Sequence, residues 1–562
     1  MHDLVIRGAT VIDGLGQNPR TADVAVTEGR IAKVGAVSSV AHRTVDADGL
    51  TLAPGFVDIH THFDAQLTWD ATASPSPALG TTTVVMGNCG FGIAPCPPHL
   101  RETMMANLSV VEGMDLNALR AGIDWEFETF PEYMDLLRRK GTVPNAAVFV
   151  GHSAVRTAVM GEAASERKTP TDDEFTAMKT IVAEAMDAGA IGLASSYSPN
   201  HIGAGGVPMP STVSDEQELA DLVDVFGKAG YGVCQIATGT RITVDMLEDF
   251  AARSGRPVFM TSAMTMYNEA LPGRAREIMD ALQAARERGN EVHAQITCQP
   301  LSFDFTPANA YPFFSHDAFA EIKAAEPDVL KKAFADPGFR DRFRQDLKTA
   351  KPGTLFFGTW DRVEIVAPAL DGNADLQNRS IAEVAAERGV DPIDFFFDLG
   401  LEEDLETAVV ARLLNVEEDG VAPLLKHPAA VIGLSDAGAH LVYMCDAGFG
   451  LHFLGRWVRE RGDFGLVEAV RRLTSHPADL YRIPDRGRIA PGAWADMILF
   501  DPDTVGVSAP KRVPDLPAGG TRTIREPKGV AGVWVNGTQV FDGRDYVEFD
   551  RPPGHVLDRF DV

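Results

Sequence analysis

The stretch Ala53-Pro54-Gly55-Phe56-Val57-Asp58-Ile59-His60-Thr61-His62 ends a short apolar run with two histidines separated by one residue. Alternate side chains of a strand point to the same face, so we expect both imidazoles to project together from a strand's end. Imidazole is the commonest metal ligand near neutral pH, and paired imidazoles suit Zn²⁺ or a similar ion. Taken alone, such a pair is more often an ordinary surface feature, so the surrounding sequence must show whether these two histidines bind a metal.

Seven further apolar runs follow, and helical patterns separate several of them. The eight runs lie at 56–62, 82–88, 146–152, 190–195, 231–237, 257–262, 291–297 and 431–436. Amphipathic helical patterns occupy connecting segments at 171–188, 215–229, 244–254 and 275–289. Eight strands that alternate with helices predict an α/β fold, a (β/α)8 TIM barrel, whose active site lies at the carboxyl ends of the strands.

Polar residues stand at one end of these runs rather than at both. Those able to bind a metal or a polar substrate are His60, His62, Asn88, Cys89, His152, Ser195, Ser196, Gln235, Thr261, Ser262 and Asp436. The seventh run carries His293, Gln295 and Thr297 on one face. This placement favours the barrel and predicts a polar site at its mouth.

The two chain ends share short strands and turns. We expect residues 1–54 and 485–562 to form one β-sandwich module, and Asn536-Gly537 is a strong hairpin signal. The barrel then comprises residues 55–302 and 426–484. The intervening residues 303–425 are too long for a loop and predict an inserted subdomain near the barrel mouth. Its aromatic residues either shape a pocket or form the core of the insertion.

Composition narrows the class of partner. The formal charge of −28 argues for solubility and against nucleic acid and anionic membranes as partners. Neither a signal peptide nor a membrane-spanning apolar segment is recognisable, so we expect a cytoplasmic protein. The five cysteines form no CxxC pair and indicate neither a disulfide framework nor a zinc knuckle. A homo-oligomer is compatible with the sequence.

Several longer motifs resemble those of one enzyme superfamily. They are APGFVDIHTHFD at 53–64, GTTTVVMGNCGFGIAP at 80–95, IGLSDAGAH at 432–440 and GAWADMILFDP at 492–502. In kind and order they are similar to motifs of the amidohydrolase superfamily, and within it to the N-acyl-D-amino-acid deacylase (D-aminoacylase) group. The resemblance covers most of the chain.

This resemblance implies a metal site and a reaction. His60, His62 and Cys89 would bind a divalent metal, Zn²⁺ or another transition-metal ion, with Cys89 in place of the modified lysine of other members. Asp436 would be both a metal-bound and the catalytic carboxylate. The implied reaction is hydrolysis of a linear amide, deacylating an N-acyl amino acid or a related N-acyl compound. The alternatives are a cyclic-amide or carbamate hydrolase and a non-catalytic binding descendant.

The chain also departs from that group. The resemblance implies two further histidines on the fifth and sixth strands and a lysine shortly after, but Gln235, Ser262 and Met264 stand nearest to those positions. We therefore expect one metal ion rather than two, unless His293 or His440 completes a second site. The residues predicted to contact substrate are His152, Tyr197, Gln235, Ser262, His293 and His440.

Overall fold

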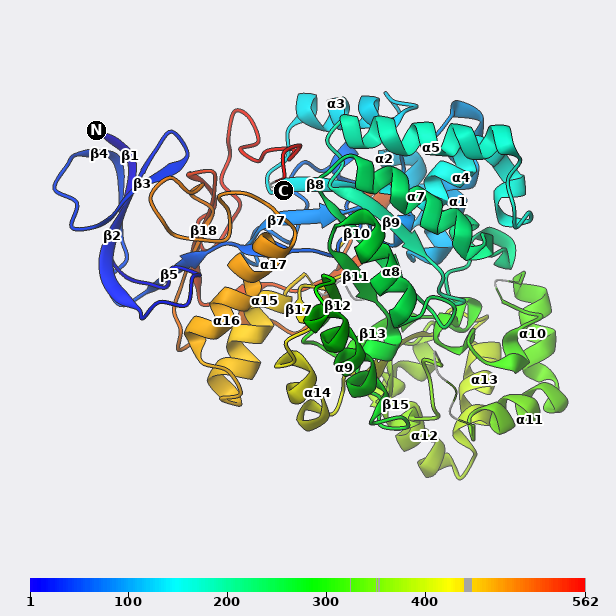
Figure 1. Cartoon of the computed structure of the whole chain (residues 1–562). Coiled ribbons are helices and arrows are strands. Elements are labelled where there is room, and N and C mark those ends of the chain that lie inside the picture. Colours follow the sequence, from blue (N-terminus) through cyan, green and yellow to red (C-terminus); the bar gives the residue numbers. More distant parts are fainter. Residues whose placement is uncertain (324, 350, 352–353, 439–446, 561–562) are drawn as a thin grey trace.

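The computed structural model describes residues 1–323, 325–349, 351, 354–438 and 447–560. At its centre lies a curled sheet of eight parallel strands. In pairing order they are β6 (Phe56–Asp58), β7 (Thr81–Met86), β8 (Asn145–Gly151), β9 (Gly192–Ser196), β10 (Val233–Ala237), β11 (Val258–Thr261), β12 (Val292–Ile296) and β17 (Ala430–Ile432), most of which are labelled in Figure 1. A parallel bridge between Thr61 and Ala437 joins the two outermost strands. The (β/α)8 barrel predicted from the eight runs is confirmed.

Four barrel helices lie close to the predicted segments. They are α5 (Asp172–Asp187), α7 (Glu216–Lys228), α8 (Val244–Ser254) and α9 (Arg274–Glu287). Thr171 caps α5 in a reciprocal capping box with Glu174, which explains why that helix begins where it does. The other helices of the barrel and its loops are α1 (Arg101–Val111), α2 (Leu116–Gly122), α3 (Phe130–Lys140), α4 (His152–Met160), α6 (Pro210–Val213), α14 (Glu418–Leu425), α15 (Phe449–His452), the π-helical segment Phe453–Glu460, α16 (Leu466–Leu473) and α17 (Ser475–Leu480).

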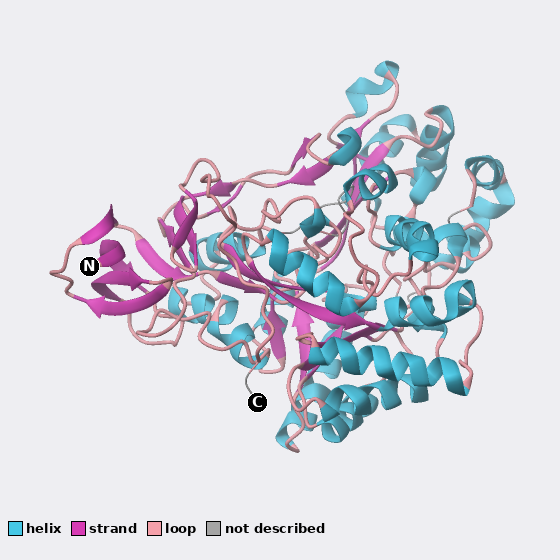
Figure 2. Cartoon of the chain, turned by 90° about the horizontal axis from the view of Figure 1, so that it is seen from above, coloured by secondary structure: helices cyan, strands magenta, loops and turns pink. Residues whose placement is uncertain are grey.

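Strands from both chain ends share a second eight-stranded sheet. Its members are β1 (His2–Val11), β2 (Arg20–Thr27), β3 (Arg30–Gly35), β4 (Ala41–Asp46), β5 (Thr51–Pro54), β18 (Met497–Phe500), β23 (Val530–Val535) and β24 (Thr538–Phe541). Two small two-stranded sheets accompany it, β19 (Gly506–Val507) with β22 (Pro527–Lys528) and β20 (Lys511–Val513) with β21 (Arg522–Ile524). Figure 2 shows the N-terminal strands at one end of the molecule and most helices at the other.

The segment between β12 and β17 has a sheet and a hydrophobic core of its own. The sheet contains β13 (Leu301–Phe305), β14 (Val363–Ala367), β15 (Arg379–Ser380) and β16 (Ala408–Leu414), and the helices are α10 (Pro327–Ala335), α11 (Pro337–Asp346), α12 (Ile381–Arg388) and α13 (Pro392–Glu402). Phe313 packs against Phe319, Phe343 and Phe356 with ring centroids 5.0–5.7 Å apart. Most of the aromatic residues therefore build this core.

None of the described helices is both long and apolar enough to cross a membrane.

Candidate metal centre

His60 and His62 lie just beyond the first barrel strand. The sequence predicts both within the strand, but β6 ends at Asp58. Past that point the backbone still forms hydrogen bonds to the segments on both sides, among them Thr61 N–H to Val85 O and His62 N–H to Ala437 O. The chain stays extended without a continuous ladder, and the two rings still lie together with centroids 5.3 Å apart.

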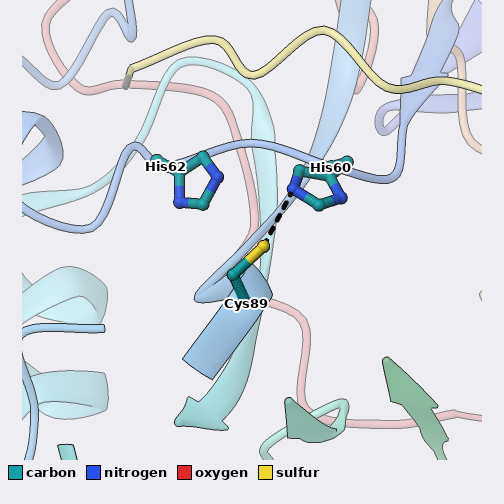
Figure 3. A group of neighbouring side chains, drawn as sticks. All are labelled: His60, His62 and Cys89. Carbon is teal, nitrogen blue, oxygen red and sulfur yellow. Dashed lines mark hydrogen bonds between the residues drawn. The ribbon is translucent and has the colours of Figure 1, made fainter. Parts of the chain in front are cut away.

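Cys89 faces this histidine pair from a short turn after β7. Its Sγ lies 3.6 Å from His60 Nε2, and one ligand atom from each of Cys89, His60 and His62 falls within 4.8 Å of the others (Figure 3). Cys89 has a left-handed φ of +55°, a conformation that side-chain-bearing residues rarely adopt. Its N–H donates to Gln235 Oε1 at 2.7 Å, which holds the turn against the fifth strand.

Asp436 supplies a carboxylate to the same group. Its Oδ1 lies 3.2 Å from His60 Nε2 and 3.5 Å from His62 Nε2. The backbone here is also left-handed, with φ of +52°, and the Asp436 N–H donates to His60 O. The side chain is 26% exposed, against 1% for His60 and 6% for His62, so the carboxylate is the most open group of the three.

A chain of neutral side chains orients His60. Its Nδ1 lies 2.7 Å from Gln295 Oε1, while Gln295 Nε2 donates to Tyr481 and to Ile59 O. Because the amide nitrogen is committed to the Ile59 carbonyl, the amide oxygen must accept from His60 Nδ1–H. Thr261 donates to the same oxygen and accepts from Gln235 Nε2. The ring is thereby held with the Nε2 lone pair directed toward Cys89 and Asp436.

Glu112, at the end of α1, is a carboxylate of the site that sequence reasoning missed. Its Oε1 lies 3.4 Å from His62 Nδ1, and both side chains are buried. Burial raises the pKa of Glu112 to about 8. Burial also opposes protonation of His62, but Glu112 and Asp436 outweigh it and raise the His62 pKa to about 9. No pattern around residue 112 distinguishes it from the end of an ordinary amphipathic helix.

The donor set fits a divalent metal ion. Two imidazoles, a thiol and a carboxylate converge, which is a combination suited to Zn²⁺ and related ions. Burial, together with the nearby Glu112 and Asp436 carboxylates, raises the pKa of the Cys89 thiol well above its usual value. A cation held there would compensate the charge of a thiolate. His60, His62, Cys89 and Asp436 are thus the residues able to hold such an ion.

A pocket opens onto these groups. It is lined by His60, His62, Cys89, Glu112 and Asp436, which come from the barrel and its loops. The insertion contributes Phe303, Tyr311 and Leu355 to the lining of the same pocket. Both interpretations of the insertion's aromatic residues therefore hold in part, because a few line the pocket while most pack internally.

The predicted substrate-contact residues are distributed unevenly. Ser262 lines the pocket, and Gln235 lies beneath Cys89 as a hydrogen-bond partner. His152 and Tyr197 are buried outside the lining: His152 lies 2.7 Å from Glu218 Oε1, and the Tyr197 hydroxyl bonds Ser214 and the Asp215 carbonyl. These two stabilise loops and helices around the barrel.

The two histidines proposed to complete a second metal site differ in position. His293 is stacked on Phe259 with ring centroids 5.2 Å apart, in the buried barrel interior, and lines no part of the pocket. It lies two residues before Gln295 on β12, one side-chain layer farther from the mouth. His440 lies outside the described residues.

Known proteins match this chain over nearly its whole length. The amidohydrolase family model covers residues 43–541. A D-aminoacylase of Alcaligenes xylosoxydans xylosoxydans is 30% identical over 99% of this chain and 98% of that protein. An N-acyl-D-glutamate deacylase of the same organism is 28% identical over 98% and 95%.

Solved structures give the same picture. A D-aminoacylase mutant in complex with CuCl₂ has a TM-score of 0.68 and 25% identity, covering 100% of both chains. The N-acyl-D-glutamate deacylase of Bordetella bronchiseptica, complexed with zinc and a phosphonate inhibitor, has a TM-score of 0.67 and 27% identity over 99% of this chain and 100% of its own. The resemblance found in the sequence motifs is confirmed.

Proposed function

This chain belongs to the amidohydrolase family, and we propose that it removes the acyl group from a linear N-acyl compound. Family and relatives identify it as a metal-dependent hydrolase of C–N amide bonds, which sets aside a non-catalytic binding role. A linear substrate is favoured because the full-length relatives are named as D-aminoacylase and N-acyl-D-glutamate deacylase.

The proposed site holds one divalent ion, Zn²⁺ or a similar transition metal, on His60, His62, Cys89 and Asp436. On the fifth strand, Gln235 accepts from the Cys89 N–H and donates to the Thr261 hydroxyl. On the sixth strand, that Thr261 hydroxyl donates to Gln295 Oε1. They offer no imidazole for a second ion. Metal content after purification, measured by plasma mass spectrometry, is expected to be close to one equivalent.

The observation that carries the mechanism is the placement of Asp436 between the two imidazoles and the open pocket. A bound divalent ion supplies Lewis acidity, which polarises an amide carbonyl and makes water a stronger nucleophile. An Asp436 carboxylate oxygen then accepts the proton of the attacking water and delivers it to the departing nitrogen. Gln295 keeps His60 in one tautomer, and the Glu112 carboxylate lies 3.4 Å from His62 Nδ1, so each ring has a polar partner at its Nδ1.

A substrate comparison tests the proposal. The zinc-loaded protein is offered N-acetyl D- and L-amino acids, simple N-acyl amines, hydantoins, lactams and carbamates, and amine or acid release is measured. Linear N-acyl compounds are expected to give the highest kcat/KM. Faster hydrolysis of a cyclic amide or a carbamate would replace the linear-amide proposal with the alternative chemistry on the same site.

A further inference from the structure

The pocket holds few charged groups besides those at the metal centre. Of the other described residues that line it, none is a lysine, arginine, aspartate or glutamate, and one, His201, is a histidine. We propose that the substrate is an N-acyl amine without an α-carboxylate, which specifies the substrate class of the deacylase function proposed above. The amine side of such a molecule is an alkyl or aryl group rather than an amino acid.

The residues that the structure leaves undescribed supply no lysine or arginine. They are residues 324, 350, 352–353, 439–446 and 561–562, and their sequence contains neither lysine nor arginine. Every lysine and arginine of the chain therefore lies among the described residues, and none of these lines the pocket.

Two guanidinium groups that follow lining residues in the sequence have other ion-pair partners. Arg241, next to the lining Thr240, lies 2.6 Å from Glu216 and donates to the carbonyls of Thr212 and Ser214. Arg274 lines a separate small cavity and is paired with Glu277 at 3.6 Å. That cavity shares with the main pocket the wall formed by Ala263, Met264 and Met266.

The groups that do line the pocket disfavour a carboxylate on the substrate. Glu112 and Asp436 already contribute acidic side chains. A buried carboxylate without a cationic partner or a full set of donors costs binding free energy, whereas enzymes that select carboxylates normally use arginine or lysine. Met264, Met266 and Phe303 instead offer an apolar surface for a hydrocarbon substituent. We expect a carboxylate to lower kcat/KM by roughly 10- to 100-fold, the effect of one unpaired charged group.

A matched pair of substrates tests this inference. N-acetylleucine, as both enantiomers, is compared with N-isopentylacetamide, which has the same carbon skeleton without the carboxylate. The zinc-loaded enzyme is expected to hydrolyse the uncharged amide at least about tenfold more efficiently. Equal or faster hydrolysis of either N-acetylleucine would overturn the inference and leave the deacylase function standing. Hydrolysis of none of the three would overturn the deacylase function, and this inference with it.

A charge introduced at Met264 gives a second readout. The side chain is half-buried in the pocket wall, so in Met264→Lys an ammonium group reaches the substrate region. The variant is expected to shift the ratio of kcat/KM values toward N-acetylleucine by at least about tenfold. Met264→Gln, similar in length but neutral, is the control and should leave the ratio near that of the wild type. An unchanged ratio in a folded Met264→Lys protein counts against the inference; should that variant not fold, the matched pair on the wild type decides.

Discussion

Ser435 donates a hydrogen bond from its hydroxyl group to Asp58 and thereby joins the last barrel strand to the first. Ser435 directly precedes Asp436, and Asp58 lies two residues before His60. Ser435 Oγ also accepts from the Ala437 N–H at 3.0 Å. The carboxylate and the imidazole of the centre come from segments nearly 380 positions apart in sequence. This short contact sets their relative position.

Removing that contact should affect both stability and turnover. Ser435→Ala leaves a buried Asp58 oxygen and the Ala437 N–H without their partner, at a cost of about 1–3 kcal/mol. We expect a lower thermal midpoint and a reduced kcat. Ser435→Thr keeps the hydroxyl and serves as the matched control. If the alanine variant melts and turns over like the wild type, the contact has no such role.

Asp436→Asn should abolish turnover without releasing the metal. Asparagine keeps the shape of the side chain and tolerates left-handed backbone, but it cannot accept the proton of water. We expect kcat to fall by about 10²- to 10⁴-fold, the contribution of a general base. Metal content, measured on the same preparation, should stay near that of the wild type. Retained turnover would remove Asp436 from the proposed mechanism.

Cys89→Ser should lower the affinity for a divalent ion, because a hydroxyl is a poorer ligand than a thiolate. Competition with a chromophoric chelator gives the dissociation constant directly. Cys96→Ser is the control, since Cys96 is also buried but its Sγ contacts only the Pro97 carbonyl among the described hydrogen bonds. Equal affinities for the two variants would show that Cys89 is a bystander.

Gln295 offers a test of how His60 is oriented. Gln295→Leu removes the acceptor for His60 Nδ1–H and is expected to weaken metal binding by about 10- to 100-fold, as is usual for the outer partners of metal-binding histidines. Gln295→Glu keeps an acceptor and should retain most of the affinity. Tyr481→Phe alters only the far side of the amide and should change it least. The order of the three affinities, rather than any single value, decides the role.

Buried His293 predicts a loss of stability in acid. Burial lowers its pKa to about 3, and neither ring nitrogen has a hydrogen-bond partner in the described part of the chain. The unfolded chain therefore binds a proton here below about pH 6.5 while the folded protein does not, so stability falls as the pH drops from 6.5 toward 3. His293→Phe removes this contribution. When the pH is lowered from 7 to 5, the melting temperature of the variant should increase relative to that of the wild type. A difference in melting temperature that does not change with pH would contradict the prediction.

The barrel could be predicted because its signal repeats. Eight apolar runs predict the eight barrel strands, and the polar residues that end each run predict which end of the barrel holds the site. The structure has a strand in every one of these runs. His293 shows the limit of that reasoning. Period-two alternation identifies the face of β12 that points inward, but it does not give depth along the strand, so His293 and Gln295 look alike in sequence.

The partners of the site were harder to predict because they depend on tertiary contacts. Glu112 comes from a helix end and Gln295 from the seventh strand, and only the closed barrel brings them to His62 and His60. The left-handed backbone of Cys89 is likewise invisible in sequence, since neither glycine nor asparagine marks the position. Ligand identity follows from motif, whereas ligand orientation follows from packing.

The pocket is bounded by residues from two separate hydrophobic cores. Cys89 belongs to the barrel core, whereas Phe303, Tyr311 and Leu355 belong to the core of the insertion. Substitutions in that insertion can reshape what the enzyme accepts while the packing beneath its chemistry stays intact. Substrate range and catalytic machinery can therefore evolve, or be engineered, as separate modules of a single chain.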